Sequence, residues 1–243
     1  MQIAEREFRP KVVPTLAAAI LFAVLLSLGF WQIDRARQKE ALYHDFLGRS
    51  AAAPVLLTGA AGESDAAAMI WRRTRLHGRW DPARTYLLDN QVHDGQAGYF
   101  AYTPLLLDHG VRVLVSRGWV PGGMNRDQAP EVPIPAGEVA LEGVVKPAPV
   151  TPVLRETPPE RLGPDVFRVQ QIDLAAIAAA NGWTLLPYEV RLDGEEAAFV
   201  RDWPVPGSGG ERHLGYAFQW FAMAAVLFVI WVAVNLRRPG AAA

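Results

Sequence analysis

The sequence predicts an α+β membrane protein in which two transmembrane helices flank a mostly antiparallel, barrel-like β domain with one short helix. Two long apolar runs near the ends of the chain predict the transmembrane helices. Between them, short β-like segments separated by turn residues predict the domain, and one helical pattern interrupts those segments.

Both apolar runs are long enough to cross a bilayer. Val12–Trp31 and Leu214–Leu236 contain no charged residue, and a helix needs roughly 20 apolar residues to span the hydrocarbon. The first run is longer than the apolar region of a signal peptide, and no small-residue cleavage site follows it. We therefore predict two retained spans.

Two spans divide the chain into five segments and place both termini on one side of the membrane. In order, the segments are the N-terminus 1–11, the first span 12–33, the β-rich domain 34–210, the second span with its boundary residues 211–236 and the C-terminus 237–243. Lys and Arg flank both faces of the spans about equally, so the positive-inside rule selects no orientation. A long middle segment can translocate regardless of its charge.

Composition and motifs reduce the number of candidate functions. A net charge of -1 gives no electrostatic argument for binding nucleic acid, and a chain without cysteine forms no disulfide or Cys-ligated metal site. The signatures of nucleotide-binding loops, zinc proteases and serine hydrolases are missing. Ser208 lies in a linker without a base nearby, and Ser116 lies in a predicted strand, where we expect a satisfied or surface hydroxyl and not a nucleophile. The histidines lack metal-ligand spacing, and we expect His93 and His109 to face solvent beside turns. We therefore do not expect an enzyme.

The domain is predicted from eight strand-like stretches after Pro54. They are 69–80, 86–92, 99–107, 111–120, 139–145, 166–172, 185–192 and 198–203. Hairpin-type turns are expected at three dipeptides: Asp94-Gly95, His109-Gly110 and Asp193-Gly194.

Helical patterns and a linker complete the domain. Residues 34–50 are expected to continue the first helix, because apolar and long side chains recur there at helical spacing. Asp173 is a suitable N-cap for a helix over 174–181, which Gly182 would end. The Pro- and Gly-rich stretch 204–210 is predicted to be a flexible tether to the second span.

The polar and aromatic residues that stand out lie at the two membrane boundaries of the domain. Because both sets flank the same segment, they lie at the same membrane face: Gly29, Trp31, Gln32, Arg35 and Lys39 from the first span, and Arg212, His213, Tyr216, Gln219 and Trp220 from the second. Helical spacing puts His213, Tyr216 and Trp220 on one face, and Gln32, Arg35 and Lys39 on one stripe.

Two interpretations of these boundary residues remain open. Interfacial Trp and Tyr belts and snorkelling Lys and Arg occur without any binding function, and Gly29 could serve only helix packing. Polar groups at membrane depth, by contrast, need partners and tend to mark sites. That argument favours a site around Gln32, Gln219 and His213.

Four stretches carry a resemblance to a known family. They are LGFWQIDRARQKEAL, GYFAYTPLLL, VLVSRGWVP and RHLGYAFQWFAMA, and they stand in this order between two terminal spans. This ordered set, which covers nearly the whole chain, resembles the Surfeit locus protein 1 family. The family's Trp-Gln pair falls on Trp31 and Gln32, its Arg-Gly-Trp on residues 117–119, and its boundary histidine on His213.

The resemblance implies an assembly factor for cytochrome c oxidase, associated with the haem a sites of subunit I. It implies a bacterial inner-membrane protein with cytoplasmic termini and a periplasmic domain, with oxidase subunit I and haem a synthase as expected partners. The sequence departs from the family at Ser116, where Asn often stands, and at Phe167, where Trp is expected. Arg117-Gly118-Trp119 also has a purely structural interpretation as the end of a strand, which we favour over ligand contact.

Two functions of different kinds follow. In the first, the protein holds haem a: His213 ligates the iron, Arg35 or Arg212 meets the propionates, and Trp31, Gln32, Tyr216 and Trp220 complete the site. In the second, the protein is a scaffold that stabilises oxidase subunit I and binds no cofactor.

Overall fold

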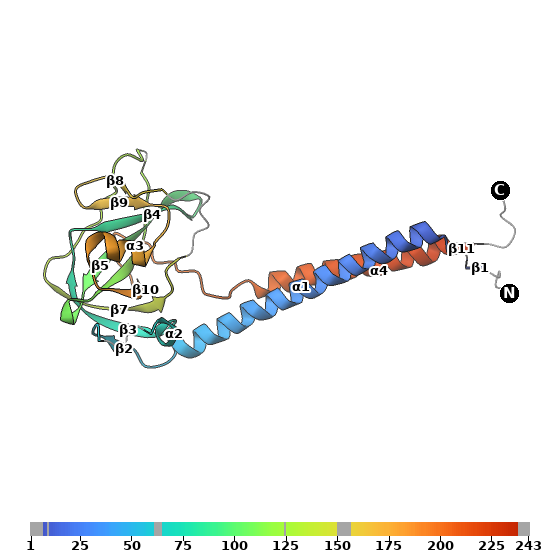
Figure 1. Ribbon diagram of the computed structural model, residues 1–243, viewed down its shortest axis with the longest axis horizontal. Helices are drawn as coiled ribbons and strands as arrows, with labels where there is room; N and C mark the ends of the chain where they lie inside the picture. The colour runs from blue at the N-terminus through green and yellow to red at the C-terminus, as the bar shows by residue number, and fades with distance from the viewer. Residues whose placement is uncertain (1–6, 9, 61–64, 124, 150–156, 238–243) are drawn as a thin grey trace. The chain divides into compact units, whose positions relative to one another are not determined.

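The structure is a computed structural model that describes residues 7–8, 10–60, 65–123, 125–149 and 157–237 (Figure 1). The chain forms two compact units. The first contains residues up to His44 together with those from Pro204 onward, and the second contains Asp45–Trp203. Each unit is described by itself below.

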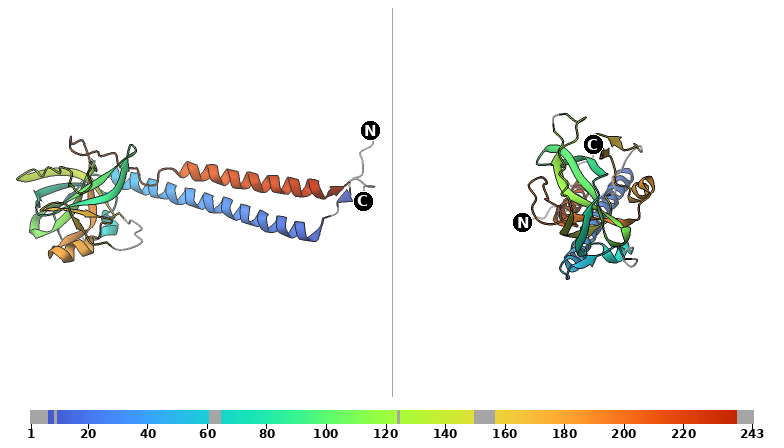
Figure 2. Two further views of the ribbon diagram at one scale, coloured as in Figure 1. Left: turned by 90° about the horizontal axis from the view of Figure 1, so that it is seen from above. Right: turned by 90° about the vertical axis from the view of Figure 1, so that its left-hand side faces the viewer.

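The first unit is a pair of long helices. α1 (Val12–Ser50) and α4 (Gly210–Asn235) lie side by side in both views of the ribbon (Figures 1 and 2). α1 continues past residue 33 as predicted and ends in the second unit. Beyond the helix ends, two short strands that the sequence did not indicate, β1 (Glu7–Phe8) and β11 (Leu236–Arg237), pair antiparallel.

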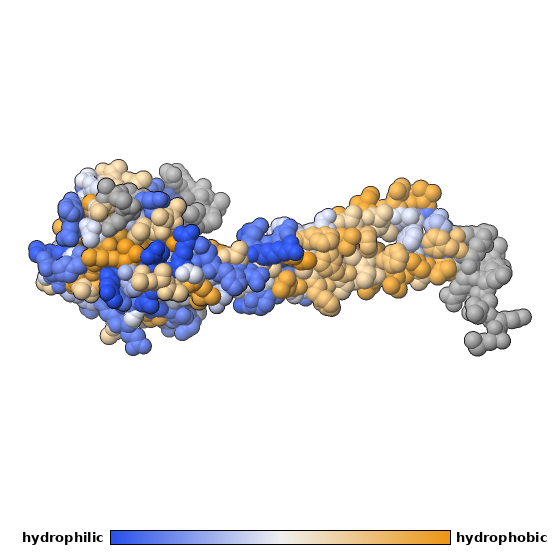
Figure 3. All heavy atoms as spheres, turned by 90° about the horizontal axis from the view of Figure 1, so that it is seen from below, coloured by the Kyte–Doolittle hydropathy of each residue, from blue (hydrophilic) through white to orange (hydrophobic). Residues whose placement is uncertain are grey.

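Both helices have the properties of membrane spans. Each is long and apolar enough to cross a bilayer, and only 11% of its most apolar window is buried. A core helix of a soluble protein would be mostly buried, whereas a span exposes its apolar side chains to lipid. Figure 3 shows apolar side chains covering most of the visible face of the helix pair.

The two helices meet along a narrow stripe, which we call the seam. On α1 the buried residues recur every three or four positions, and on α4 small side chains and a polar residue are buried: Leu25, Gly29, Gln32 and Ala36 against Ala217, Ala224 and Asn235. This spacing is the one that keeps a stripe facing a neighbouring helix. Gln32 and His213 therefore face the partner helix because of their sequence positions.

The second unit is built on a nine-stranded mixed sheet in the order β2-β3-β7-β10-β6-β5-β4-β9-β8. The strands are β2 (Val55–Leu57), β3 (Arg73–Trp80), β4 (Thr85–His93), β5 (Gln96–Leu106), β6 (Arg112–Pro121), β7 (Glu138–Lys146), β8 (Glu160–Arg161), β9 (Val166–Val169) and β10 (Leu185–Leu192). The pairs β2–β3, β6–β10 and β4–β9 are parallel and the remaining described pairs are antiparallel. β3 also pairs with β5, so β3, β7, β10, β6 and β5 form a closed hydrogen-bonded circuit around an apolar core.

Seven of the eight predicted strands are present, and one prediction was wrong. Within 198–203 only Val200 reaches a strand, in a bridge to Trp119. The reason is a tight turn just before it, in which the Phe199 N–H donates to the Glu196 carbonyl oxygen at 3.0 Å. The first predicted strand, 69–80, begins later than expected, at Arg73, because Met69 ends the short helix α2 (Ala66–Met69), which Asp65 caps.

Two of the three predicted hairpin turns are present, since Asp94-Gly95 joins β4 to β5 and His109-Gly110 joins β5 to β6. Asp193-Gly194 follows β10, and no described strand after it pairs with β10, so that prediction was wrong. Asp94 and Gly95 connect β4 to β5 with positive φ at both positions, as a type I′ turn requires. α3 (Leu174–Asn181) begins at Asp173, whose side chain accepts from the Ala176 N–H at 2.9 Å, and ends at left-handed Gly182.

The predicted flexible tether is instead a turn packed on α1. Gly207 is buried with φ +75°, and a Cβ there would lie 2.3 Å from the Lys39 carbonyl oxygen. Only a glycine allows this approach, so the turn is held against the α1 backbone just before α4 begins.

Candidate functional site

The strongest site candidate is a polar pair in the seam of the helix pair. The imidazole of His213 on α4 lies with Nδ1 2.7 Å from the side-chain Oε1 of Gln32 on α1. Gln32 is buried and His213 is half-buried. An amide oxygen only accepts hydrogen bonds, so this contact favours the neutral tautomer in which Nδ1–H of His213 donates and Nε2 carries the lone pair. In that tautomer Nε2 is available as a metal ligand.

The other predicted site residues surround this pair with differing exposure. Arg35, Arg212, Tyr216 and Trp31 are exposed, and Trp220 is half-buried. Arg35 donates to Gln38 Oε1 at 3.0 Å on its own helix. His213, Tyr216 and Trp220 all lie in the continuous helix α4 and so share one helix face as predicted, on which Tyr216 is exposed, at 53%.

Lys39 and Gln219 are placed differently by the helix geometry. Lys39 is half-buried along the same stripe as Gln32, whereas Gln219 is exposed and lies away from the seam. At this level the polar pair of the seam is therefore Gln32 and His213. Arg35 on α1 and Arg212 on α4, both exposed, are the arginines nearest to this pair in the sequence.

Close packing of α1 against α4 requires a glycine at position 29, one helical turn before Gln32. A Cβ at Gly29 would lie 2.6 Å from the Phe221 ring, and Phe221 also packs edge-on against Phe30, with 5.3 Å between the ring centroids. The sequence did not indicate Phe221, although its spacing from His213 places it near the seam.

We predict that Gly29→Leu destabilises the helix pair by about 1–3 kcal/mol, because an enlarged side chain must displace the Phe221 ring. Thermal unfolding of the full chain in detergent, followed by circular dichroism, measures the effect. The matched control is Gly215→Leu on α4, since a Cβ there meets nothing within 4 Å. Equal melting temperatures for the two variants would contradict the packing role of Gly29.

Arg117 has a structural role in the second unit. Its side chain is 1% exposed and donates to the Pro133 carbonyl oxygen at 2.6 Å and to Glu196 Oε1 at 2.7 Å. Arg201 also pairs with Glu196 and donates to the Arg117 carbonyl oxygen. Burial lowers the pKa of Arg117, and Glu196 opposes that shift. These contacts support the structural interpretation of the Arg-Gly-Trp stretch.

Gly118 and Trp119 fit the same interpretation. Gly118 has φ +136°, and a Cβ there would lie 2.7 Å from the Phe199 side chain. Trp119 is buried, and its Nε1–H donates to the Gln91 carbonyl oxygen. His93, expected in solvent, is half-buried against the Trp119 ring at 5.3 Å, whereas His109 is exposed as predicted.

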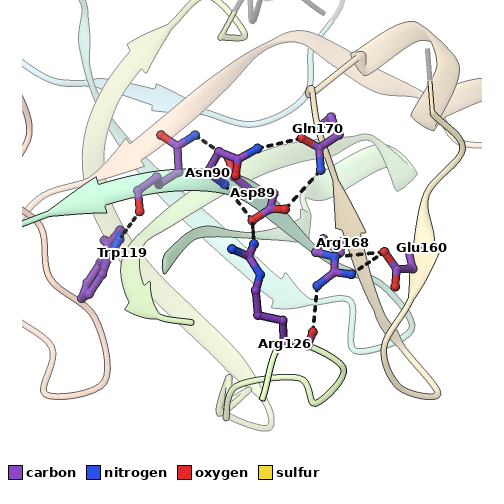
Figure 4. Close-up of polar contacts among 8 residues, drawn as sticks. Asp89, Asn90, Trp119, Arg126, Glu160, Arg168 and Gln170 are labelled. Atoms are coloured by element: carbon purple, nitrogen blue, oxygen red, sulfur yellow. Dashed lines mark hydrogen bonds and ion pairs between the residues drawn. The ribbon is translucent and has the colours of Figure 1, made fainter. Parts of the chain in front are cut away.

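A second polar cluster, around Asp89, joins β4, β9 and the segment after β6 (Figure 4). The buried Asp89 carboxylate accepts from the Asn90 N–H at 2.7 Å, from Gln170 Nε2 at 3.1 Å and from Arg126. Arg168 pairs with Glu160 and donates to the Arg126 carbonyl oxygen. Each charged group in this cluster has a partner within the chain, so the cluster serves to fix the loops.

A buried carboxylate on β10 is the third candidate. Glu189 Oε1 accepts from Arg191 Nε at 2.8 Å, and burial raises the pKa of Glu189. Burial also lowers the pKa of the nearby Lys146 to about 8.

Ser116 is fully buried on the neighbouring strand β6, where a substrate cannot reach it. Among the described residues, no group of three or more acidic, His or Cys side chains could hold a metal ion.

Comparison with known proteins points to one family. A model of the SURF1 family matches residues 19–225, which include both members of the Gln32–His213 pair. A SURF1-like protein of Drosophila melanogaster is 28% identical over 89% of this chain and 75% of its own length. A SURF1-like protein of Monosiga brevicollis is 29% identical over 89% and 85%, and Surfeit locus protein 1 of Homo sapiens is 26% identical over 88% and 75%.

Proposed function

The chain belongs to the SURF1 family, and on that premise we propose that it is an assembly factor for cytochrome c oxidase that holds haem a as cargo, or assists its insertion into subunit I. The observation that supports this proposal most is the Gln32–His213 pair. A histidine whose Nδ1–H is already bonded and whose Nε2 is free is the usual form of a haem ligand.

The surrounding residues fit the chemistry of haem a. This haem combines an apolar macrocycle and an isoprenoid tail with two anionic propionates. Apolar helix faces can bury the first two, and the exposed guanidinium groups of Arg35 and Arg212 can pair with carboxylates. Trp31 and Tyr216 offer exposed aromatic surface at the same boundary. In this proposal His213 would ligate the iron, and the iron would supply the bond that retains the cargo.

The proposal includes a location and partners. The protein would lie in the bacterial inner membrane as two spans, with both termini in the cytoplasm and the β-rich domain in the periplasm. Oxidase subunit I would receive the haem, and haem a synthase would supply it. The two long, apolar and mostly exposed helices support membrane residence, and the composition gives no argument for nucleic acid as a partner.

An absorption spectrum tests the proposed function. The full chain, purified in detergent from cells that make haem a, should show a Soret band, and the same protein from cells unable to make haem a should lose the spectrum of that haem. A colourless protein that still co-purifies with subunit I would instead favour a scaffold that binds no cofactor.

A further inference from the structure

An apolar groove lies between α1 and α4, near the ends of the helices that are farther from His213. It has a volume of about 300 Å³ and is lined by Thr15, Ala18, Ala19, Phe22, Leu227, Phe228 and Trp231. The two adjacent alanines of α1 lie among much larger side chains of α4, and this difference in size hollows the surface. The volume is at the lower end of the range for ligand pockets.

The lining of the groove favours an apolar chain as its ligand. Its two polar side-chain groups are already paired, since Trp231 Nε1–H donates to Thr15 Oγ1 at 3.2 Å. The remaining lining residues are aliphatic or phenyl groups. A ligand here therefore needs no hydrogen-bonding group, and a polar ligand would lose its hydration without finding a partner.

The distance from the Gln32–His213 pair fits one chain in particular. Phe22 and Thr15, at the two ends of the groove, precede Gln32 on the same helix. At about 1.5 Å per residue, the groove begins about 15 Å from Gln32 and ends about 25 Å from it. The isoprenoid tail has a main chain of about twelve carbons joined by bonds of about 1.5 Å. Because the chain zigzags, each bond advances it by less than its full length, and the extended tail reaches about 15 Å beyond the macrocycle that carries it.

We propose that this groove binds the isoprenoid tail of the haem whose iron is held at His213. The inference rests on the proposed function and extends it by assigning a second binding site to the same cargo. Lipid is as apolar as the groove, so transfer of the tail from lipid gains little hydrophobic energy. Its stabilisation comes from van der Waals contact with a shaped surface, and its effect on affinity is correspondingly moderate.

The test compares haem o with haem b, which differ only in the isoprenoid tail. Each is titrated into the full chain in lipid nanodiscs, where acyl chains compete for the groove, and the Soret change gives the affinity. The wild type should bind haem o about threefold or more tighter than haem b. Ala19→Leu fills the exposed part of the groove and should remove that preference while leaving haem b affinity unchanged.

Ala17→Leu provides the matched control, because Ala17 is exposed on the same helix and does not line the groove. It should keep the wild-type preference for haem o. Equal affinity of the wild type for both haems would overturn the tail site and leave the proposed function standing. A uniform loss of both haems in Ala19→Leu would also overturn it. A wild type that binds neither haem would overturn the proposed function together with the tail site.

Discussion

Replacing His213 by alanine is expected to remove most of the haem from the purified protein without lowering its abundance in the membrane. The change deletes the proposed iron ligand, whereas insertion depends on the apolar runs, to which a boundary imidazole contributes little. The measurement is the ratio of Soret to protein absorbance at equal membrane abundance. We expect this ratio to fall because the affinity for haem decreases about tenfold or more, the effect of losing about 1.4 kcal/mol or more of binding energy.

Other variants in the same assay separate ligation from general packing. Gln32→Leu keeps a buried side chain but removes the acceptor for Nδ1–H, so it should weaken retention and shift the haem spectrum. Trp31→Ala and Arg35→Ala should weaken retention less, through lost packing and lost propionate pairing. His44→Ala is the control, because His44 is exposed on α1 outside the seam. Equal haem content in the wild type and His213→Ala would make His213 an ordinary boundary residue and favour the scaffold.

Replacing Arg117 by methionine is expected to destabilise the second unit by about 3 kcal/mol or more. Methionine keeps much of the volume but leaves Glu196 facing Arg201 alone, and the Pro133 carbonyl oxygen loses its donor. Breaking a buried ion pair by removing one member costs about 3–5 kcal/mol. Arg117 is the buried member here, since its side chain is 1% exposed and that of Glu196 is 32% exposed. Urea unfolding of the full chain in detergent, followed by tryptophan fluorescence, measures the loss.

An exposed arginine provides the control for Arg117. Arg75 pairs with Glu142 at 2.9 Å, and more than half of the Arg75 side chain is exposed. Arg75→Met should therefore cost no more than about 1 kcal/mol. If the two arginine variants unfold at the same urea concentration, the Arg117 cluster would not be the structural element that its contacts indicate.

The sequence predicted local structure well because local patterns determine it. The apolar runs, the cap at Asp173 and the turn at Asp94-Gly95 all depend on neighbours within a few residues. The parallel pairing of β6 with β10 and the pairing of β3 with β5 could not be predicted in this way, since they join segments far apart in the chain.

For the candidate site, too, the sequence predicted the residues but not the contact between them. The positions of Gln32 and His213 on either side of the same long segment predicted one common membrane boundary, but only the structure brings Oε1 to Nδ1. The prediction of a flexible tether over 204–210 was wrong because glycines in such a stretch are compatible with two kinds of structure. They indicate flexibility in an isolated chain, and in this fold Gly207 instead permits direct contact with the α1 backbone.

The helix pair has a polar link at two levels, which fixes the register of one helix against the other. Gln32 bonds to His213 near one end of the pair, and Thr15 bonds to Trp231 near the other. Nearly equal stretches of helix separate the two links on α1 and α4, so a slide of one helix along the other would break both at once. In a bilayer of another thickness we therefore expect the pair to tilt as one body, with the imidazole at an unchanged level relative to both helices.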